Sequence, residues 1–224
     1  MLTLPNVTLV AVSSIDLDGT LFALSLSSSQ IQFGVIKLLT SELIKPVNEN
    51  IKVELIPKLD YLGYSKFMLE DLHSHIDTPY CLVIQADGFV LNPSKWQDKF
   101  LDYDYIGAPW PKRLVAGPDR VTIHMQKNRV GNGGFSLRSK KLLLETSKIN
   151  FDSLNFLTMN EDMIIGHYMY EQMVAAGIRF PEPDLAAKFS VESPHAAYGE
   201  SPNTSFGFHG KRIRDQIFNS IAEG

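Results

Sequence analysis

The sequence has a single cysteine among its 224 residues, Cys81, so an internal disulfide is excluded and a reducing compartment is expected. No run of ~18 apolar residues occurs, and no basic segment followed by a long apolar stretch opens the chain. From these two absences we expect no transmembrane helix and no secretory leader. No basic block stands out and the formal net charge is −4, which argues against a nucleic-acid partner. We therefore expect a cytoplasmic protein.

The composition is that of one globular domain. The chain has a mass of 25.1 kDa, with 44% hydrophobic and 21% charged residues, which is enough for a substantial core. Apolar runs predict strands at residues 7–12, 35–39, 53–56 and 80–84. Predicted helices at 21–30 and 64–72 lie between them. This βαβ order favours a parallel sheet with right-handed crossovers.

The second half of the chain has weaker patterns. We expect a helix from Pro93 to Leu101 and a mobile loop over the site from Lys112 to Asn128. Three further helices are predicted at residues 140–147, 160–176 and 185–189, the second of them ended by Gly177.

The strand from Tyr80 ends in Gln85-Ala86-Asp87-Gly88, where α/β sheets place their chemistry. Gln85 and Asp87 alternate and so point to the same side, while Gly88 allows a sharp turn beneath a bound group. A lone carboxylate there suits a divalent metal or a diphosphate. The alternative is that Asp87 and Gly88 only form a tight turn.

The segment from Asp16 to Thr20 reads Asp-Leu-Asp-Gly-Thr, which looks like the nucleophile motif of haloacid-dehalogenase-type phosphatases. In such an enzyme Asp16 attacks phosphorus and Asp18 acts as acid and base. Two serines interrupt the strand before Asp16, and no later Gly-Asp-x-x-x-Asp or Asp-Asp motif supplies that family's acidic metal site. The structural alternative is a helix cap formed by Asp18 or Thr20.

Two side chains have both a binding and a structural interpretation. Lys66 begins a polar helix face and can reach the phosphates of a sugar nucleotide, or it is simply solvated. Trp110 lies between two prolines, which favours a partly exposed ring that stacks on a sugar or orders a lid. Core packing is the alternative for Trp110.

A glycine-rich segment, Gly131-Asn132-Gly133-Gly134, precedes a β-type stretch. Its lack of Cβ atoms lets a ligand approach the backbone closely, whereas a hairpin turn needs fewer glycines. The segment does not match the dinucleotide-binding pattern Gly-x-Gly-x-x-Gly, so a Rossmann dinucleotide site is disfavoured.

Charged residues mark two later positions. Glu161 and Asp162 follow Asn160, a natural N-cap, so they either complement the helix dipole or face a substrate. Near the C-terminus His209 can ligate a metal, and the cations Lys211 and Arg212 can hold phosphate.

The joint occurrence of several motifs is more specific than any one of them. From Leu4 to Gly210 the chain resembles a bacterial family of predicted glycosyltransferases catalogued as a domain of unknown function. The resemblance implies an α/β, GT-A-like (Rossmann-like) sandwich with a central, mainly parallel sheet flanked by helices. It implies one domain, 1–224, with a nucleotide-sugar-binding half at 1–92 and an acceptor-binding half at 93–224. The motifs are Gln-x-Asp-Gly-Phe, Tyr-Asp-Tyr-Ile-Gly-Ala-Pro-Trp, Gly-Asn-Gly-Gly-Phe-Ser-Leu-Arg, Asn-Glu-Asp and Phe-Gly-Phe-His-Gly.

The resemblance also implies roles for individual residues. Asp87 matches the last acid of the Asp-x-Asp motif that holds a metal and the donor diphosphate, but Gln85 replaces the first acid. Mg²⁺ or Mn²⁺ then relies on Asp87, His209 and phosphate oxygens; alternatively, Lys211 and Arg212 neutralise the diphosphate without a metal.

Further roles follow from the same resemblance. Asp162, or Glu161, matches the general base, and Ser13 touches the nucleoside. The implied donor-binding residues are Ser13, Lys66, Gln85, Asp87, Gly88 and Lys211, and the implied acceptor-binding residues are Trp110, Asn132, Gly133 and Gly134.

The implied function is transfer of a sugar from a nucleotide-sugar donor to a hydroxyl of a glycan or lipid-linked acceptor, in surface polysaccharide synthesis. Such a role is compatible with peripheral contact at the inner face of the membrane. Two alternatives stay open. One is the phosphatase that uses Asp16 and Asp18. The other is a non-catalytic sugar-binding module, favoured if Asp87 and Asp162 faced different surfaces.

Overall fold

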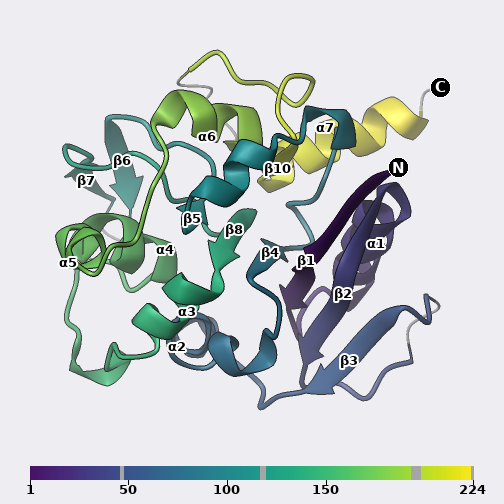
Figure 1. Ribbon diagram of the computed structural model, residues 1–224, viewed down its shortest axis with the longest axis horizontal. Coiled ribbons are helices and arrows are strands. Elements are labelled where there is room, and N and C mark those ends of the chain that lie inside the picture. Colours follow the sequence, from purple (N-terminus) through teal and green to yellow (C-terminus); the bar gives the residue numbers. More distant parts are fainter. Residues whose placement is uncertain (46–47, 117–119, 193–197, 223–224) are drawn as a thin grey trace.

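A computed structural model of the protein describes residues 1–45, 48–116, 120–192 and 198–222. A six-stranded sheet with the order β3-β2-β1-β4-β8-β5 runs through its centre (Figure 1). The first four strands in this order are mutually parallel, and β8 is antiparallel to both of its neighbours. The strands are β1 (Leu2–Val12), β2 (Ile31–Thr40), β3 (Ile51–Leu55), β4 (Tyr80–Ile84), β5 (Tyr105–Ile106) and β8 (Ser136–Ser139).

Helices cover both faces of this sheet because its central strands are apolar on both sides. In β1, Leu9 and Ala11 pack toward one core cluster, whereas Val10 and Val12 pack toward the other. The first face is covered by α1 (Leu17–Gln30), α6 (Pro183–Phe189) and α7 (Lys211–Ala222), and the second by α2 (Tyr61–Glu70) and α3 (Lys140–Thr146). The predicted α/β sandwich with a mainly parallel central sheet is confirmed.

Two predictions near the N-terminus need correction. The first helix begins at Leu17 rather than Leu21, and its cap is Asp16, whose Oδ1 accepts the N–H of Gly19 at 3.0 Å. Neither Asp18 nor Thr20 is the cap. The second strand begins at Ile31 rather than at residue 35, and Gly34 lies inside it, where an added Cβ would meet the carbonyl oxygen of Pro5 at 2.1 Å. That glycine permits close approach to β1 where the register shifts.

Two predictions in the middle of the chain also differ from the structure. The expected helix from Pro93 to Leu101 is two short 3₁₀ turns, η2 (Pro93–Lys95) and η3 (Asp98–Asp102). The expected loop at 112–128 contains a hairpin of β6 (Arg113–Ala116) and β7 (Val121–His124), while residues 117–119 lie outside the described residues.

The predicted helix at 160–176 is present but interrupted. It consists of α4 (Glu161–Met163), a π-helical segment η5 (Ile164–Tyr168) and α5 (Tyr170–Ala175), and Gly177 follows with φ +80°. Its apolar side chains pack with those of α3 in a further cluster. π-Helical turns often occur at functional sites, and this one begins two positions after Asp162.

The remaining short elements complete the fold. They are η1 (Leu72–His75), η4 (Phe151–Ser153) and the parallel pair β9 (Ser190–Glu192) and β10 (Gly207–His209). Across the four described ranges, no helix has the length and apolarity needed to cross a membrane.

Candidate functional site

A pocket of about 590 Å³ opens at the carboxyl ends of β1 and β4. Parallel strands deliver their following residues to one edge of the sheet, which is why ligands bind there in open α/β folds. The pocket is lined by ten of the residues to which the family resemblance gives a role: Ser13, Gln85, Asp87, Asn132, Gly133, Gly134, Glu161, Asp162, His209 and Lys211.

The turn after β4 places the side chains of Gln85 and Asp87 in the pocket. Gln85 and Gly88 exchange two backbone hydrogen bonds, of 3.1 and 3.0 Å, so the segment is a tight turn as well as part of the pocket. The side chain of Gln85 donates to Tyr64 Oη at 3.0 Å, and its Oε1 lies 3.2 Å from His209 Nε2. Asp87 Oδ1 lies 3.6 Å from the same imidazole nitrogen.

His209 is brought to this turn by β10. Its Nδ1 lies 3.6 Å from Glu192 Oε1, and Glu192 accepts a hydrogen bond from the amide of Asn132 at 2.7 Å. Burial lowers the pKa of His209, but interaction with Glu192 and the charge of Asp87 outweigh it and raise the pKa. Gly134 is required beside the ring, because an added Cβ would lie 2.1 Å from His209 Nε2.

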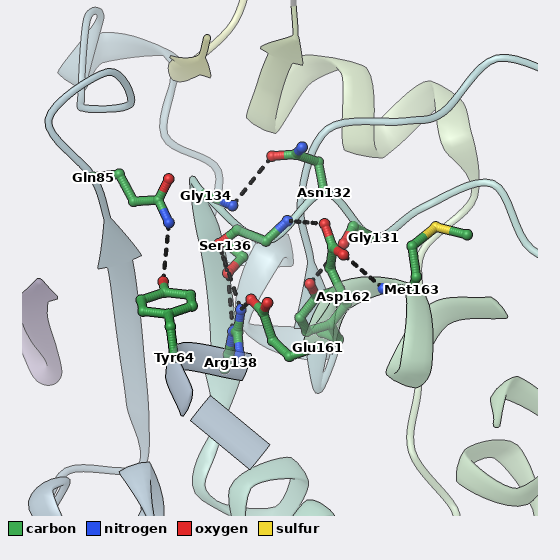
Figure 2. A network of polar contacts seen from close by, with 12 residues as sticks. Tyr64, Gln85, Gly131, Asn132, Gly134, Ser136, Arg138, Glu161, Asp162 and Met163 are labelled. Carbon is green, nitrogen blue, oxygen red and sulfur yellow. Dashed lines mark hydrogen bonds and ion pairs between the residues drawn. The ribbon is translucent and has the colours of Figure 1, made fainter. Parts of the chain in front are cut away.

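Asp162 faces the pocket from the first turn of α4. Its Oδ2 accepts the backbone N–H of Gly133 at 3.1 Å, and its Oδ1 accepts that of Met163 at 2.7 Å (Figure 2). Burial and the adjacent charge of Glu161 raise the pKa of Asp162 to about 7, even though both backbone N–H groups oppose the shift. A carboxylate with such a pKa can accept a proton near neutral pH.

Glu161 turns away from Asp162 into the protein. It is only 5% exposed and forms an ion pair with Arg138, whose Nη2 lies 2.9 Å from Glu161 Oε1. Successive residues of a helix project about 100° apart, so only one of the two adjacent carboxylates can face the same ligand well, and the ion pair occupies Glu161. The geometry therefore favours Asp162 as the free carboxylate.

The pocket unites residues that the sequence placed far apart. Asp87 and Asp162 line the same pocket, so the arrangement expected of a non-catalytic sugar-binding module is not observed. Gly88 does not line the pocket itself, but an added Cβ at this position would lie 3.0 Å from the carbonyl oxygen of Phe208 and 3.1 Å from that of Gly134 and from the ring of His209. Gly88 thus supports the turn rather than touching a ligand.

Two predicted binding residues lie outside the pocket lining. Lys66 contacts the carboxylate of Asp152 and lies 3.9 Å from Glu70, so it does not reach the pocket. Trp110 is not partly exposed but 2% exposed, and it packs with Ile123, Met125 and Met163 in a separate core cluster. Core packing, the alternative interpretation for Trp110, is correct.

The prediction that Arg212 contributes to the site is also wrong. It is exposed and does not line the pocket, whereas Arg214, one position beyond a buried isoleucine, does. Arg214 Nη1 lies 3.9 Å from Asp16 Oδ2, which connects α7 to the start of α1. Helical periodicity after Gly210 was the available signal, because residues 211 and 214 share one face of a helix.

Sequence reasoning missed four further residues around the pocket. Tyr61 and Asn160 both line the pocket and contact each other, with Asn160 Nδ2 donating to Tyr61 Oη at 2.5 Å. Glu192 and Arg138 were not singled out either. For Arg138 a signal existed, since a charged residue stands in a short strand of otherwise small or apolar residues.

The two aspartates of the phosphatase-like segment do not converge. Asp16 lines the pocket but uses its carboxylate as the cap of α1, while Asp18 is exposed and does not line the pocket. A nucleophile and an acid-base partner need to face one reacting group. The structure therefore does not bring together the pair that the phosphatase interpretation requires.

The residues present fit a divalent cation shared with a phosphate ligand. Among the described residues, no three His, Cys, Asp or Glu side chains are grouped to hold a metal ion. Asp87 Oδ1 and His209 Nε2, 3.6 Å apart, are nevertheless close enough to be neighbouring ligands. Mg²⁺ and Mn²⁺ commonly take one or two protein ligands and complete their shell with phosphate oxygens and water.

Comparison with known proteins gives the family and the fold. Residues 50–209 match the family described as "Protein of unknown function (DUF5672)". The chain belongs to this family. The match spans both Gln85-Ala86-Asp87-Gly88 and His209, so the pocket lies largely within the family domain. No curated protein matches the chain.

The chain also matches solved structures. One is a glycosyltransferase involved in the glycosylation of the major capsid of PBCV-1, with a TM-score of 0.52 and 10% identity, covering 96% of this chain and 98% of that chain. Another is the bifunctional IspDF from Campylobacter jejuni, with a TM-score of 0.42 and 14% identity over 68% of this chain and 45% of that chain. The first match shows that the chain shares the overall fold of that glycosyltransferase.

Proposed function

We propose that the protein is a glycosyltransferase that moves a sugar from a nucleotide-sugar donor to a hydroxyl group of an acceptor. The observation that carries this proposal is the position of Asp162 in one pocket with Asp87, His209 and Lys211. The pocket thus combines a proton acceptor with groups suited to a diphosphate. The glycosyltransferase-like fold supports the same function.

The donor diphosphate binds at the turn after β4. Asp87 and His209 would hold a Mg²⁺ or Mn²⁺ ion together with oxygens of the diphosphate, and Lys211 and Arg214 add positive charge from α7. When bound, the ion supplies positive charge that stabilises the departing diphosphate. Ser13, whose N–H donates to the carbonyl of Leu39 at 3.0 Å, lies where the nucleoside enters.

Asp162 acts as the general base in a direct displacement. The acceptor oxygen forms a bond to the anomeric carbon of the donor, the bond from that carbon to the diphosphate oxygen breaks, and the hydroxyl proton passes to Asp162. Each carboxylate oxygen has two lone pairs, so the N–H groups of Gly133 and Met163 leave positions free for the hydroxyl. A direct displacement of this kind inverts the anomeric configuration.

The acceptor enters beside Tyr61 and the glycine-rich segment. Tyr61 is 68% exposed, lines the pocket, and is fixed by its hydrogen bond to Asn160, two positions before Asp162. An exposed aromatic ring next to a catalytic carboxylate suits stacking against a sugar. We therefore favour a glycan or lipid-linked glycan acceptor, as in surface polysaccharide synthesis, with access from the inner membrane surface for a lipid-linked substrate.

A thermal-shift panel of nucleotide sugars, with and without Mn²⁺, tests this proposal directly. A nucleotide sugar that raises the melting temperature, with a larger rise in Mn²⁺, identifies the donor and supports the metal site. Release of the nucleoside diphosphate in the presence of a glycan acceptor then demonstrates transfer. Binding without any release, with every acceptor offered, would support the sugar-binding module instead.

A further inference from the structure

A fully buried guanidinium lies behind the pocket. Arg138, on β8, is 0% exposed. Its guanidinium group lies over the ring of Tyr105, with 5.3 Å between the guanidinium carbon and the ring centroid. Its Nε donates to Ser136 Oγ at 3.0 Å and its Nη2 to Glu161 at 2.9 Å. Burial of a charge is costly, so such a group needs a specific reason to be there.

The same groups hold the peptide that touches Asp162. Ser136 Oγ donates to the carbonyl oxygen of Gly133 at 2.9 Å, and Arg138 Nη2 approaches that oxygen at 3.4 Å. On the other side of the residue, the N–H of Gly133 donates to Asp162 Oδ2 (Figure 2). The orientation of the Asp162 carboxylate is therefore tied to Arg138 through a single residue.

Close packing makes this connection rigid. A Cβ on Gly133 would lie 2.5 Å from Glu161 Oε1 and 3.1 Å from both Arg138 Nη2 and Asp162 Cβ. The carbonyl group of Gly131, two positions before Gly133, is also fixed, because Tyr105 Oη donates a hydrogen bond to its oxygen at 2.7 Å. The glycine-rich segment thus lies against the ion pair with no space for a side chain.

We propose that Arg138 and Glu161 are positioning residues for the reaction, which orient the Asp162 carboxylate through the Gly133 peptide and place a fixed negative charge beside it. This inference rests on the proposed function, in which Asp162 is the base. Neither Arg138 nor Glu161 touches the substrate. Their contribution is the geometry and proton affinity of the carboxylate that does.

Stability alone does not require the pair. Replacing a buried ion pair by apolar or neutral groups of similar volume is often neutral or stabilising, whereas removing one partner leaves an uncompensated charge. Replacing both partners at once therefore separates a positioning role from a structural one. The charge next to Asp162 comes from Glu161, and the other titratable groups that interact electrostatically with Asp162 are Glu192, His209, Tyr64 and Tyr105.

The test compares two double variants. Arg138→Met with Glu161→Gln removes the ion pair beside Asp162. Lys37→Met with Glu54→Gln removes a partly buried ion pair, of 2.6 Å, neither member of which lines the pocket. We expect both proteins to fold and to bind the donor with unchanged Kd. Only the first should lose kcat, by at least about tenfold, because a misplaced base costs rate rather than affinity.

Two further measurements distinguish geometry from charge. Ser136→Ala removes one hydrogen bond to Gly133 but keeps the pair, so kcat should fall a few-fold without any change in the pH profile. The double variant at Arg138 and Glu161 should shift the acidic limb of its pH profile to lower pH, because the anion beside Asp162 is lost. Wild-type kcat together with an unshifted profile in this variant would overturn the inference.

A readout without turnover keeps the inference separate from the proposed function. Carbon-13 NMR of the aspartate carboxyls, with Asp162→Asn to assign the signal, follows the titration of Asp162 in the wild type and in Glu161→Gln. We expect a lower pKa in the variant even if no acceptor is ever found. An unchanged titration overturns the inference, whereas the absence of transfer in an otherwise normal wild type overturns the proposed function.

Discussion

The backbone N–H of Gly133 donates a hydrogen bond to Oδ2 of Asp162 over 3.1 Å. This bond joins the glycine-rich segment before β8 to the first turn of α4, two parts of the chain that only the fold brings together. It orients the carboxylate toward the pocket and leaves lone pairs free on both oxygens. The proposed base and the wall of the proposed acceptor site are therefore held together by a direct hydrogen bond.

Asp162→Asn should lower kcat by roughly two orders of magnitude or more, since general-base catalysis contributes about that much. Donor binding should not change, because an amide keeps the shape of the carboxylate. The wild-type rate should rise as pH increases through about 7, where Asp162 loses its proton, and the variant should lose this limb. Asp152→Asn, at an exposed aspartate outside the pocket lining, is the matched control. Equal rates in the two variants would exclude Asp162 as the base.

Chelation tests the metal. If Asp87 and His209 share an ion with the donor, EDTA should weaken nucleoside diphosphate binding and Mn²⁺ should restore it in titration calorimetry. The dependence on Mn²⁺ should weaken as pH falls, because the raised pKa of His209 favours the protonated ring, which cannot bind a metal. Binding that persists in EDTA but is lost when Lys211 and Arg214 are changed to alanine would favour the metal-free alternative.

The two arginines of α7 provide a matched pair. Arg214 lines the pocket and is partly buried, whereas Arg212 is exposed and does not line it. Arg214→Ala should therefore weaken nucleoside diphosphate binding by about tenfold, the range of a charge-assisted hydrogen bond. Arg212→Ala should leave the dissociation constant unchanged in the same titration. The reverse pattern would restore the role that the sequence gives to Arg212.

Tyr61 and Trp110 should behave oppositely. Tyr61→Ala should raise the KM for the acceptor with little change in melting temperature, because the ring is 68% exposed. Trp110→Ala should lower stability by ~3–5 kcal/mol, the usual cost of removing a buried large aromatic side chain. Chemical denaturation and acceptor kinetics on both variants check the two effects. An unchanged acceptor KM in Tyr61→Ala would remove Tyr61 from the acceptor site.

The sequence predicts the first half of the fold well because its strands are short apolar runs separated by clear helices. The buried parallel strand before Gln85 is an example, since periodicity and the following glycine mark both its nature and its end. Elements held by tertiary packing are harder to predict. The segment from Pro93 to Leu101 has helical spacing but forms two 3₁₀ turns, around a Phe100 ring that packs against Phe189 and Phe206.

The site shows the same division. Polar residues after strands and glycine clusters carry local signals, so Gln85, Asp87 and the glycine-rich segment were found from the sequence. The binding roles predicted for Trp110 and Lys66 were wrong, because the sequence alone does not show which surface an aromatic ring or a cation faces. Arg138 and Tyr61 belong to the site through contacts with residues 23 and 99 positions away, respectively. No local sequence pattern predicts contacts between residues so far apart.

Substitution of Asp87 and Asp16 by asparagine, assayed for donor turnover, tests the glycosyltransferase proposal most directly. Asp87→Asn should abolish hydrolysis or transfer of the nucleotide sugar with little loss of melting temperature, because asparagine keeps the shape and loses the charge that a cation requires. Asp16→Asn should retain most of the activity, since asparagine caps a helix as well as aspartate does. Release of phosphate from a generic phosphomonoester by the wild type, lost in Asp16→Asn and kept in Asp87→Asn, would contradict the proposal.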